Sequence, residues 1–120
     1  MPPESRDAAH LWDMLSAARE ACAVAAGLTL EEFLADRLRL RALERTLELL
    51  GEAARRVTPQ MQSGLPDIPW RALIGQRNLL AHEYGRIDSV LLYRTATQDL
   101  PPLIVILEGI TLTRTDRTSP

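Results

Sequence analysis

The chain has 120 residues, a length that suits one domain with a core of moderate size. Its formal net charge is −2 at pH 7, so the domain does not attract nucleic acid through its overall field, and any RNA binding must come from a local patch. The single cysteine, Cys22, excludes an internal disulfide, no apolar run reaches the length of a membrane span, and residues 1–4 do not open a signal peptide. We therefore expect a cytoplasmic protein with no membrane association.

The first predicted helix runs from about Asp7 to Ala26, after a frayed segment over residues 1–6. Apolar side chains recur there at steps of three and four residues: Leu11, Met14, Leu15, Ala18, Cys22 and Ala25. Gly27 follows and is expected to end the helix, because glycine tolerates the left-handed conformation of a helix C-terminus.

The second predicted helix has a well-marked start and runs to about Val57. Thr29 and Glu32 have the spacing of a capping box, and Leu28 and Phe33 that of a hydrophobic staple. Two adjacent apolar stripes follow, one with Leu34, Leu38, Ala42, Leu49 and Ala53 and the other with Leu40, Leu43, Leu47, Leu50 and Ala54. We expect one stripe to face the bundle and the other to face a second chain.

Arginines are frequent on this second helix, where Arg37, Arg41 and Arg45 lie four residues apart and Arg55 and Arg56 follow. An RNA-binding track is one interpretation. Glutamates at positions 44, 48 and 52 favour the other, a solvated face on which opposite charges pair along the helix.

The remaining elements are shorter. A loop is predicted from Thr58 to Ile68, then a third helix opened by Pro69 and Trp70 and closed by Gly85. A fourth helix over 88–98, a short fifth beginning near 99–102 and a disordered tail over 113–120 complete the chain. The fold class is therefore all-α: one antiparallel bundle of four to five helices over residues 1–112.

One stretch of the third helix carries recognisable chemistry: Arg77, Asn78, His82 and Tyr84 fall within eight residues. Arginine matches phosphate oxygens with a fixed fork of donors, and histidine can transfer a proton near neutral pH. Together they could cleave a phosphodiester without a metal ion or cofactor. The spacing alone also fits a solvated arginine and a histidine that caps the last turn.

The spacing also has a geometric consequence. At 100° per residue, Arg77 and Tyr84 share one helix face, whereas His82 is about 140° away from Arg77. Either the helix breaks near His82, or a second copy of the chain completes the site across a two-fold axis.

Other chemistries find little support in the sequence. It has no glycine-rich phosphate loop and no pair of cysteines with metal-ligand spacing, so we expect no metal site. His10 and His82 fall on different predicted helices. A nucleophile pair of Cys22 and His82 lacks any local group that would activate the thiol.

The pattern as a whole resembles the HepT-like branch of the HEPN superfamily, the toxins of toxin–antitoxin pairs. The resemblance covers about Asp13 to Leu107, and its elements are Glu31–Asp36, Gly51–Ala54, Ile68–Trp70, Arg77–Tyr84 with Ile87 and Asp88, and Asp99–Pro101. Tyr93 stands where many relatives carry tryptophan, a difference that concerns packing rather than chemistry.

The resemblance implies a helical homodimer with a composite cleft and metal-independent endoribonuclease activity. Arg77 would hold the scissile phosphate, and His82 would help the ribose 2′-hydroxyl attack phosphorus. Asn78 would support either group. Tyr84 matches the tyrosine to which a nucleotidyltransferase antitoxin of the MntA type transfers AMP, which would place bulk and negative charge where an RNA phosphate should sit.

Two alternatives remain open. The chain could be a non-catalytic partner of a nucleotidyltransferase, with the motif serving as a docking and modification site. It could also be a structural helical dimer in which Arg77 and His82 only stabilise the interface.

Overall fold

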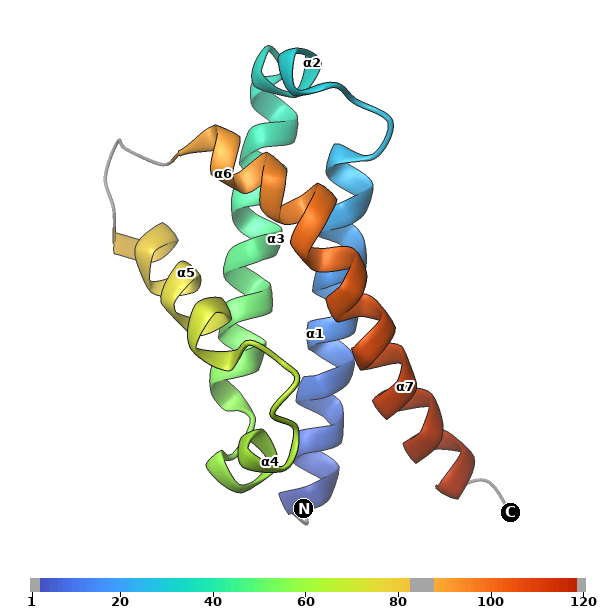
Figure 1. The fold of residues 1–120 in the computed structure, drawn as a ribbon. Helices are drawn as coiled ribbons and strands as arrows, with labels where there is room; N and C mark the ends of the chain where they lie inside the picture. Colours follow the sequence, from blue (N-terminus) through green and yellow to red (C-terminus); the bar gives the residue numbers. More distant parts are fainter. Residues whose placement is uncertain (1–2, 83–87, 119–120) are drawn as a thin grey trace.

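The computed structural model describes residues 3–82 and 88–118, with side chains over 6–76 and 88–111, and these ranges form helices and turns without a strand (Figure 1). The all-α prediction is confirmed. The elements are α1 (Pro3–Ala25), α2 (Leu30–Leu34), α3 (Arg37–Arg56), α4 (Pro59–Gly64), α5 (Trp70–His82), α6 (Ser89–Arg94), the π-helical segment η1 (Thr95–Asp99) and α7 (Leu100–Thr118).

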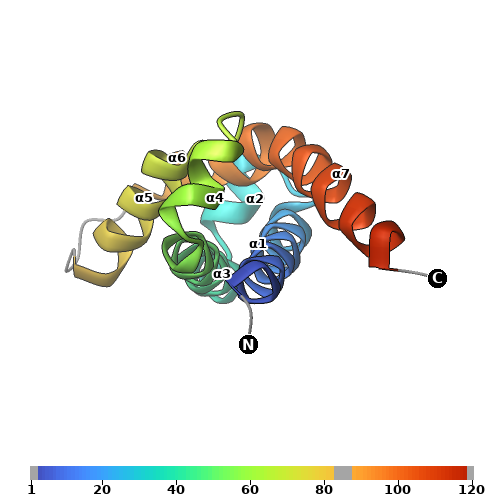
Figure 2. The ribbon, with the colours of Figure 1, turned by 90° about the horizontal axis from the view of Figure 1, so that it is seen from below.

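The long helices alternate in direction, as expected of an antiparallel bundle. Viewed from below, α1 and α3 lie side by side, α5 flanks α3, and α7 flanks α1 (Figure 2). The core forms where these helices meet, and its fully buried side chains include Leu11, Met14, Leu15, Phe33, Leu43, Leu47, Leu50, Leu100 and Leu107. Among the described residues, none of the helices is both long enough and apolar enough to cross a bilayer.

Helix α1 buries the predicted apolar stripe and ends before Gly27, whose φ of 77° is the left-handed value expected there. Its start differs from the prediction, because the backbone is helical from Pro3. Asp7 is buried and accepts hydrogen bonds from the backbone N–H of Thr58 (2.9 Å) and from its hydroxyl (2.7 Å). This link fastens the start of α1 to the turn between α3 and α4.

The expected single helix from residue 29 to Val57 is two helices. The Thr29–Glu32 capping box is present, but α2 ends after one turn and Asp36 caps a new helix by accepting from the backbone N–H of Arg39 at 3.1 Å. The break places Phe33 in the core, where its ring lies 5.5 Å from that of Tyr93. An acidic cap within a helical pattern therefore restarted the helix.

The predicted loop after Val57 contains the short helix α4, which Thr58 caps by accepting from the backbone N–H of Met61 at 3.3 Å. Threonine followed by proline is a start signal that the loop prediction overlooked.

The expected break near residue 99 is absent: Thr95 and Leu100 both have right-handed helical backbones, so α6, η1 and α7 form one continuous helical path. The backbone N–H of Leu100 donates to the carbonyl of Thr95, five residues back. Pro101 and Pro102 follow, and because proline has no N–H, the wider π turn accommodates them without ending the helix. Helix α7 continues to Thr118, past residue 112 where a tail was expected to begin.

Candidate functional site: the C-terminal half of α5

Helix α5 holds most of the predicted site. It begins at Trp70, as expected, and its backbone stays helical through His82, so Arg77, Asn78 and His82 lie on its last two turns. The side chains of these three residues and the whole of Tyr84 lie outside the described part of the chain.

Helix α5 stays helical up to His82, its last residue, so positions 77 and 82 keep their helical register. Position 77 lies seven residues beyond buried Trp70, and position 78 lies seven residues beyond exposed Arg71. Each step of seven residues returns to within about 20° of the starting direction. Arg77 is therefore in register with the packed side of α5, and His82 is about 140° away, in register with the exposed side.

The start of α5 is held firmly. Trp70 is 9% exposed, and its indole N–H donates to the carbonyl of Leu65 at 3.0 Å. The turn that supplies this carbonyl follows α4, whose cap, Thr58, is the partner of buried Asp7. Beyond this anchor, α5 packs mainly along α3.

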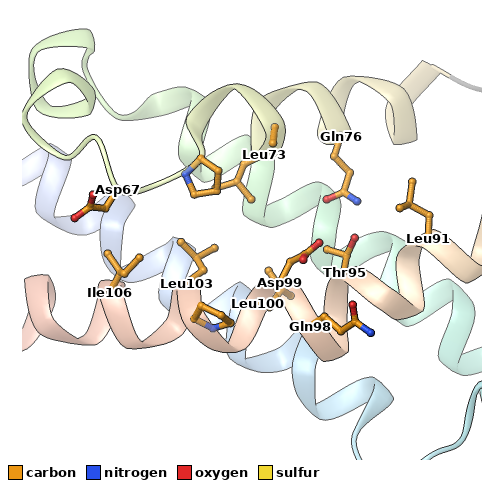
Figure 3. Close-up of a pocket in the computed structure, with 13 residues that line it drawn as sticks. Asp67, Leu73, Gln76, Leu91, Thr95, Gln98, Asp99, Leu100, Leu103 and Ile106 are labelled. Atoms are coloured by element: carbon orange, nitrogen blue, oxygen red, sulfur yellow. The ribbon is translucent and has the colours of Figure 1, made fainter.

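A groove of about 500 Å³ separates α5 from the α6–η1–α7 path (Figure 3). Its apolar surface comes from both sides: Pro69, Ala72 and Leu73, and across the gap Leu91, Leu100, Pro102, Leu103 and Ile106. Gln76 points across toward Thr95, and Asp67 and Asp99 supply acidic groups. The leucine at position 91 is 47% exposed, so this apolar surface is open to a partner.

The first predicted stripe, which runs from Leu34 of α2 along α3 to Ala53 and is called here the α3 stripe, is also open at its three leucines. Leu34, Leu38 and Leu49 are 42%, 83% and 39% exposed, whereas Ala53 of the same stripe is buried. Leu49 lines a hollow with His10 and other α1 residues, on the α1 side of α3. The stripe is therefore apolar and uncovered, but it does not adjoin α5.

Apart from Arg37, the arginines of α3 are paired, which favours the solvated-face interpretation. Arg41 pairs with Glu44 at 2.9 Å, and Arg45 pairs with Glu48 at 3.2 Å. Glu52 pairs with Arg55 at 2.9 Å and with Arg56 at 3.2 Å. Hydrogen bonding and the charge of Glu52 raise the pKa of Arg55 further, so this cation stays charged and engaged.

Cys22 is a half-buried free thiol with a structural role. Its Sγ lies 3.3 Å from the carbonyl oxygen of Ala96, which Pro101 cannot satisfy from the next turn. Burial raises the pKa of the thiol, the opposite of what a nucleophile needs. His10 lies 4.0 Å from Asp13 on its own helix.

The sequence alone did not indicate the groove or the exposed Arg71. The groove depends on the distance between α5 and α7, which no local pattern encodes. Arg71 could have been found, because it precedes Asn78 by seven residues and His82 by eleven.

The family model and the similar proteins that match this chain indicate the same family. Residues 14–110 match the family model described as Ribonuclease HepT-like. A candidate RNase of Methanocaldococcus jannaschii, MJ1380, is 32% identical over 95 residues, covering 79% of this chain and 87% of that protein. A probable ribonuclease HepT of Thermococcus cleftensis is 36% identical over 73 residues, covering 61% of this chain and 66% of that protein.

No solved structure matches the chain. The family match spans the second half of α1, the whole of α3 and α5, and most of the α6–η1–α7 path. The chain therefore belongs to the HepT-like ribonuclease family.

Proposed function

We propose that the protein is a metal-independent endoribonuclease, the toxin of a type VII-like toxin–antitoxin pair. The observation that carries the proposal is the family match over residues 14–110, which includes all of α5 with Arg77 and His82. His82 would take the proton of a ribose 2′-hydroxyl as that oxygen attacks phosphorus, and Arg77 would neutralise the charge that develops on the phosphate oxygens. The bond from phosphorus to the 5′-oxygen of the next nucleotide breaks, the leaving oxygen takes up a proton, and a 2′,3′-cyclic phosphate remains. Because DNA lacks the 2′-hydroxyl, the substrate is RNA. Asn78 would orient the phosphate or the imidazole.

The site is completed by a second copy of the chain. An unbroken helix holds positions 77 and 82 about 140° apart, so one copy does not bring both to a single point by register alone. The groove beside α5 offers the second copy an apolar surface next to the motif, whereas the α3 stripe would leave the two α5 helices apart. We therefore place the two-fold interface at the groove. An isologous contact uses the same surface of both chains, so each chain contributes the same residues to the interface.

Control of the site would act through Tyr84. Transfer of AMP to its hydroxyl by a nucleotidyltransferase antitoxin of the MntA type adds a phosphate and a base two residues from His82. The added negative charge would repel an RNA phosphate from the same place.

A second candidate function is a non-catalytic partner of a nucleotidyltransferase. The paired Arg41 and Arg45 of α3 and the net charge of −2 favour it, since pairing with glutamates reduces the positive charge that this face offers to RNA. This function predicts a stable complex with the transferase and modification of Tyr84 without nuclease activity.

The test is cleavage of bulk RNA by purified protein, with Tyr84 shown to be unmodified by mass spectrometry, in excess EDTA. We expect cleavage that leaves a cyclic phosphate end, and a loss of roughly 10²–10⁴-fold in His82→Ala, the usual contribution of general acid–base catalysis. Cleavage that persists in His82→Ala would contradict the assignment. An inactive, unmodified wild type would favour the non-catalytic partner.

A further inference from the structure

The exposed side of α5 carries a polar feature that the motif does not include. Arg71 is exposed and makes no hydrogen bond or ion pair within the part of the chain whose side chains are described. Arg41 and Arg45 of α3, by contrast, are each engaged by a glutamate. Arg6, Arg37 and Arg94 are likewise exposed without a partner among the described residues, but they lie on other helices.

The position of Arg71 on α5 links it to the motif. Positions 71, 78 and 82 are separated by seven and four residues, so positions 78 and 82 each lie within about 20° of position 71 around the helix axis, on one side of the helix. The distance along the axis from 71 to 82 is about 16 Å at 1.5 Å per residue. We call this line of positions the Arg71 stripe.

A hollow of about 560 Å³ borders the stripe where α4 meets α5. It is lined by Gln62, Trp70, Arg71, Ile74 and Gly75. Gln62 is held in place because its side-chain amide donates to the carbonyls of Val57 (3.0 Å) and Ala54 (3.3 Å). The hollow combines a fixed amide, a cation and apolar side chains.

Gly75 leaves the middle of the stripe uncovered. A Cβ built at this position would meet nothing within 4 Å, so the helix backbone is open to close approach between Arg71 and Asn78. Asp67 is the acidic residue nearest in sequence, and it lines the groove bordered by Ala72 and Gln76 instead. Because the groove and the hollow are lined by different residues of α5, a second copy seated in the groove leaves Arg71 free.

We propose that the Arg71 stripe is an RNA-binding subsite that holds the strand flanking the cleaved phosphate. Arg71 binds a phosphate oxygen remote from the cleavage point, and the strand passes over Gly75 toward Asn78 and His82. This inference rests on the proposed nuclease function. It supplies the local patch that an acidic chain needs in order to bind RNA.

The reach of the stripe sets a length requirement. About 16 Å corresponds to at most about five stacked nucleotides at 3.4 Å each. A dinucleotide substrate spans only the cleavage point. Arg71 therefore contributes to the binding of an oligonucleotide and not to the cleavage of a dinucleotide.

The experiment compares the wild type with two variants, Arg71→Ala and Arg45→Ala. Each variant lacks one positive charge. With a 20-nucleotide single-stranded RNA, Arg71→Ala should raise KM roughly tenfold and leave kcat within about twofold, since it removes one charged contact to phosphate. Arg45→Ala should match wild type, and Arg71→Lys should recover part of the affinity. With a dinucleotide, all variants should match wild type.

Binding of the same sequence as fully 2′-O-methyl RNA, which has no free 2′-hydroxyl, gives a second readout. The slope of log binding constant against log salt should fall by about 0.7 in Arg71→Ala, the value for one lost phosphate contact on a single strand. Gly75→Leu should weaken binding without changing that slope, because it blocks the stripe without removing a charge.

Two results distinguish a failure of the Arg71 subsite from a failure of the proposed nuclease function. An unchanged KM and salt slope in Arg71→Ala, in a wild type that cleaves RNA, would overturn the stripe alone. A wild type that cleaves no RNA would overturn the nuclease function, and the salt slopes would then decide whether Arg71 binds RNA. Equal unfolding midpoints in all variants would show that a loss of fold does not explain the changes.

Discussion

Helices α3 and α5 pack against each other, yet they present different surfaces. Helix α3 is covered by α1 and α5, buries seven residues, and has Arg41, Arg45, Arg55 and Arg56 paired with glutamates. Helix α5 packs mainly on α3, is bordered by a groove and by a hollow, and carries Arg71, which has no partner among the described side chains. Helix α5 thus borders both open cavities next to the motif, whereas α3 mainly provides the core.

The largest difference between α3 and α5 should appear in how substitutions change the free energy of unfolding. Leu50 on α3 is fully buried, so Leu50→Ala should lower the free energy of unfolding by about 2–5 kcal/mol, the cost of a core cavity. Gly75→Ala on α5 adds a Cβ in open space and should raise it by up to about 1 kcal/mol through helix propensity. Urea unfolding measures both. A large loss in Gly75→Ala would mean that another part of the protein covers this side of α5.

The second largest difference between α3 and α5 should appear in the strength of dimer association. Leu91 lines the groove beside α5, and Leu38 is the most exposed leucine of the α3 stripe. Leu91→Arg should weaken association by about 1.5–3 kcal/mol, the value of one buried leucine, because it places a charge in the interface. Leu38→Arg should leave association unchanged. Sedimentation equilibrium tests this, and the reverse pattern would move the interface to the stripe that the sequence analysis favoured.

A small effect on stability is expected at Glu32. Its carboxylate accepts a hydrogen bond from the backbone N–H of Thr29 at 2.9 Å, in the capping box at the start of α2. This hydrogen bond, with one from the Thr29 side chain, lowers the pKa of Glu32. The stabilisation is therefore present above the ordinary carboxyl pKa and is lost as the pH falls through the lowered folded-state value. Glu32→Gln keeps an acceptor without titrating.

The difference in urea midpoint between wild type and Glu32→Gln should consequently shrink on going from about pH 7 to about pH 3. A difference that stays constant over this range would show that the capping box does not depend on the charge of Glu32.

Local signals predicted much of the fold. The apolar stripe of α1, the Thr29–Glu32 capping box and the start of α5 at Trp70 all follow from short-range patterns. Features set by packing between distant segments could not be read in this way. Asp36 restarts the helix so that Phe33 reaches Tyr93, sixty residues away, and the π turn before Pro101 keeps a path helical where prolines suggested a break.

The candidate site divides in the same way. Arg77, Asn78, His82 and Tyr84 are found from their spacing, which is local. The groove requires the placement of α7 against α1, and the structure adds that Arg71, unlike Arg41 and Arg45 of α3, has no partner among the described side chains. Charge counting along the sequence treats all these arginines alike.

The central claim is that the α5 helices of two chains share one RNA-cleaving site. The direct measurement is RNA cleavage by Arg77→Ala and His82→Ala proteins, each alone and then mixed under conditions that exchange subunits. If the arginine of one chain works with the histidine of the other, each variant alone is inactive and the mixture recovers activity, because one intact site forms in each mixed dimer. A mixture that stays inactive, with subunit exchange demonstrated by mass spectrometry, would contradict the shared site.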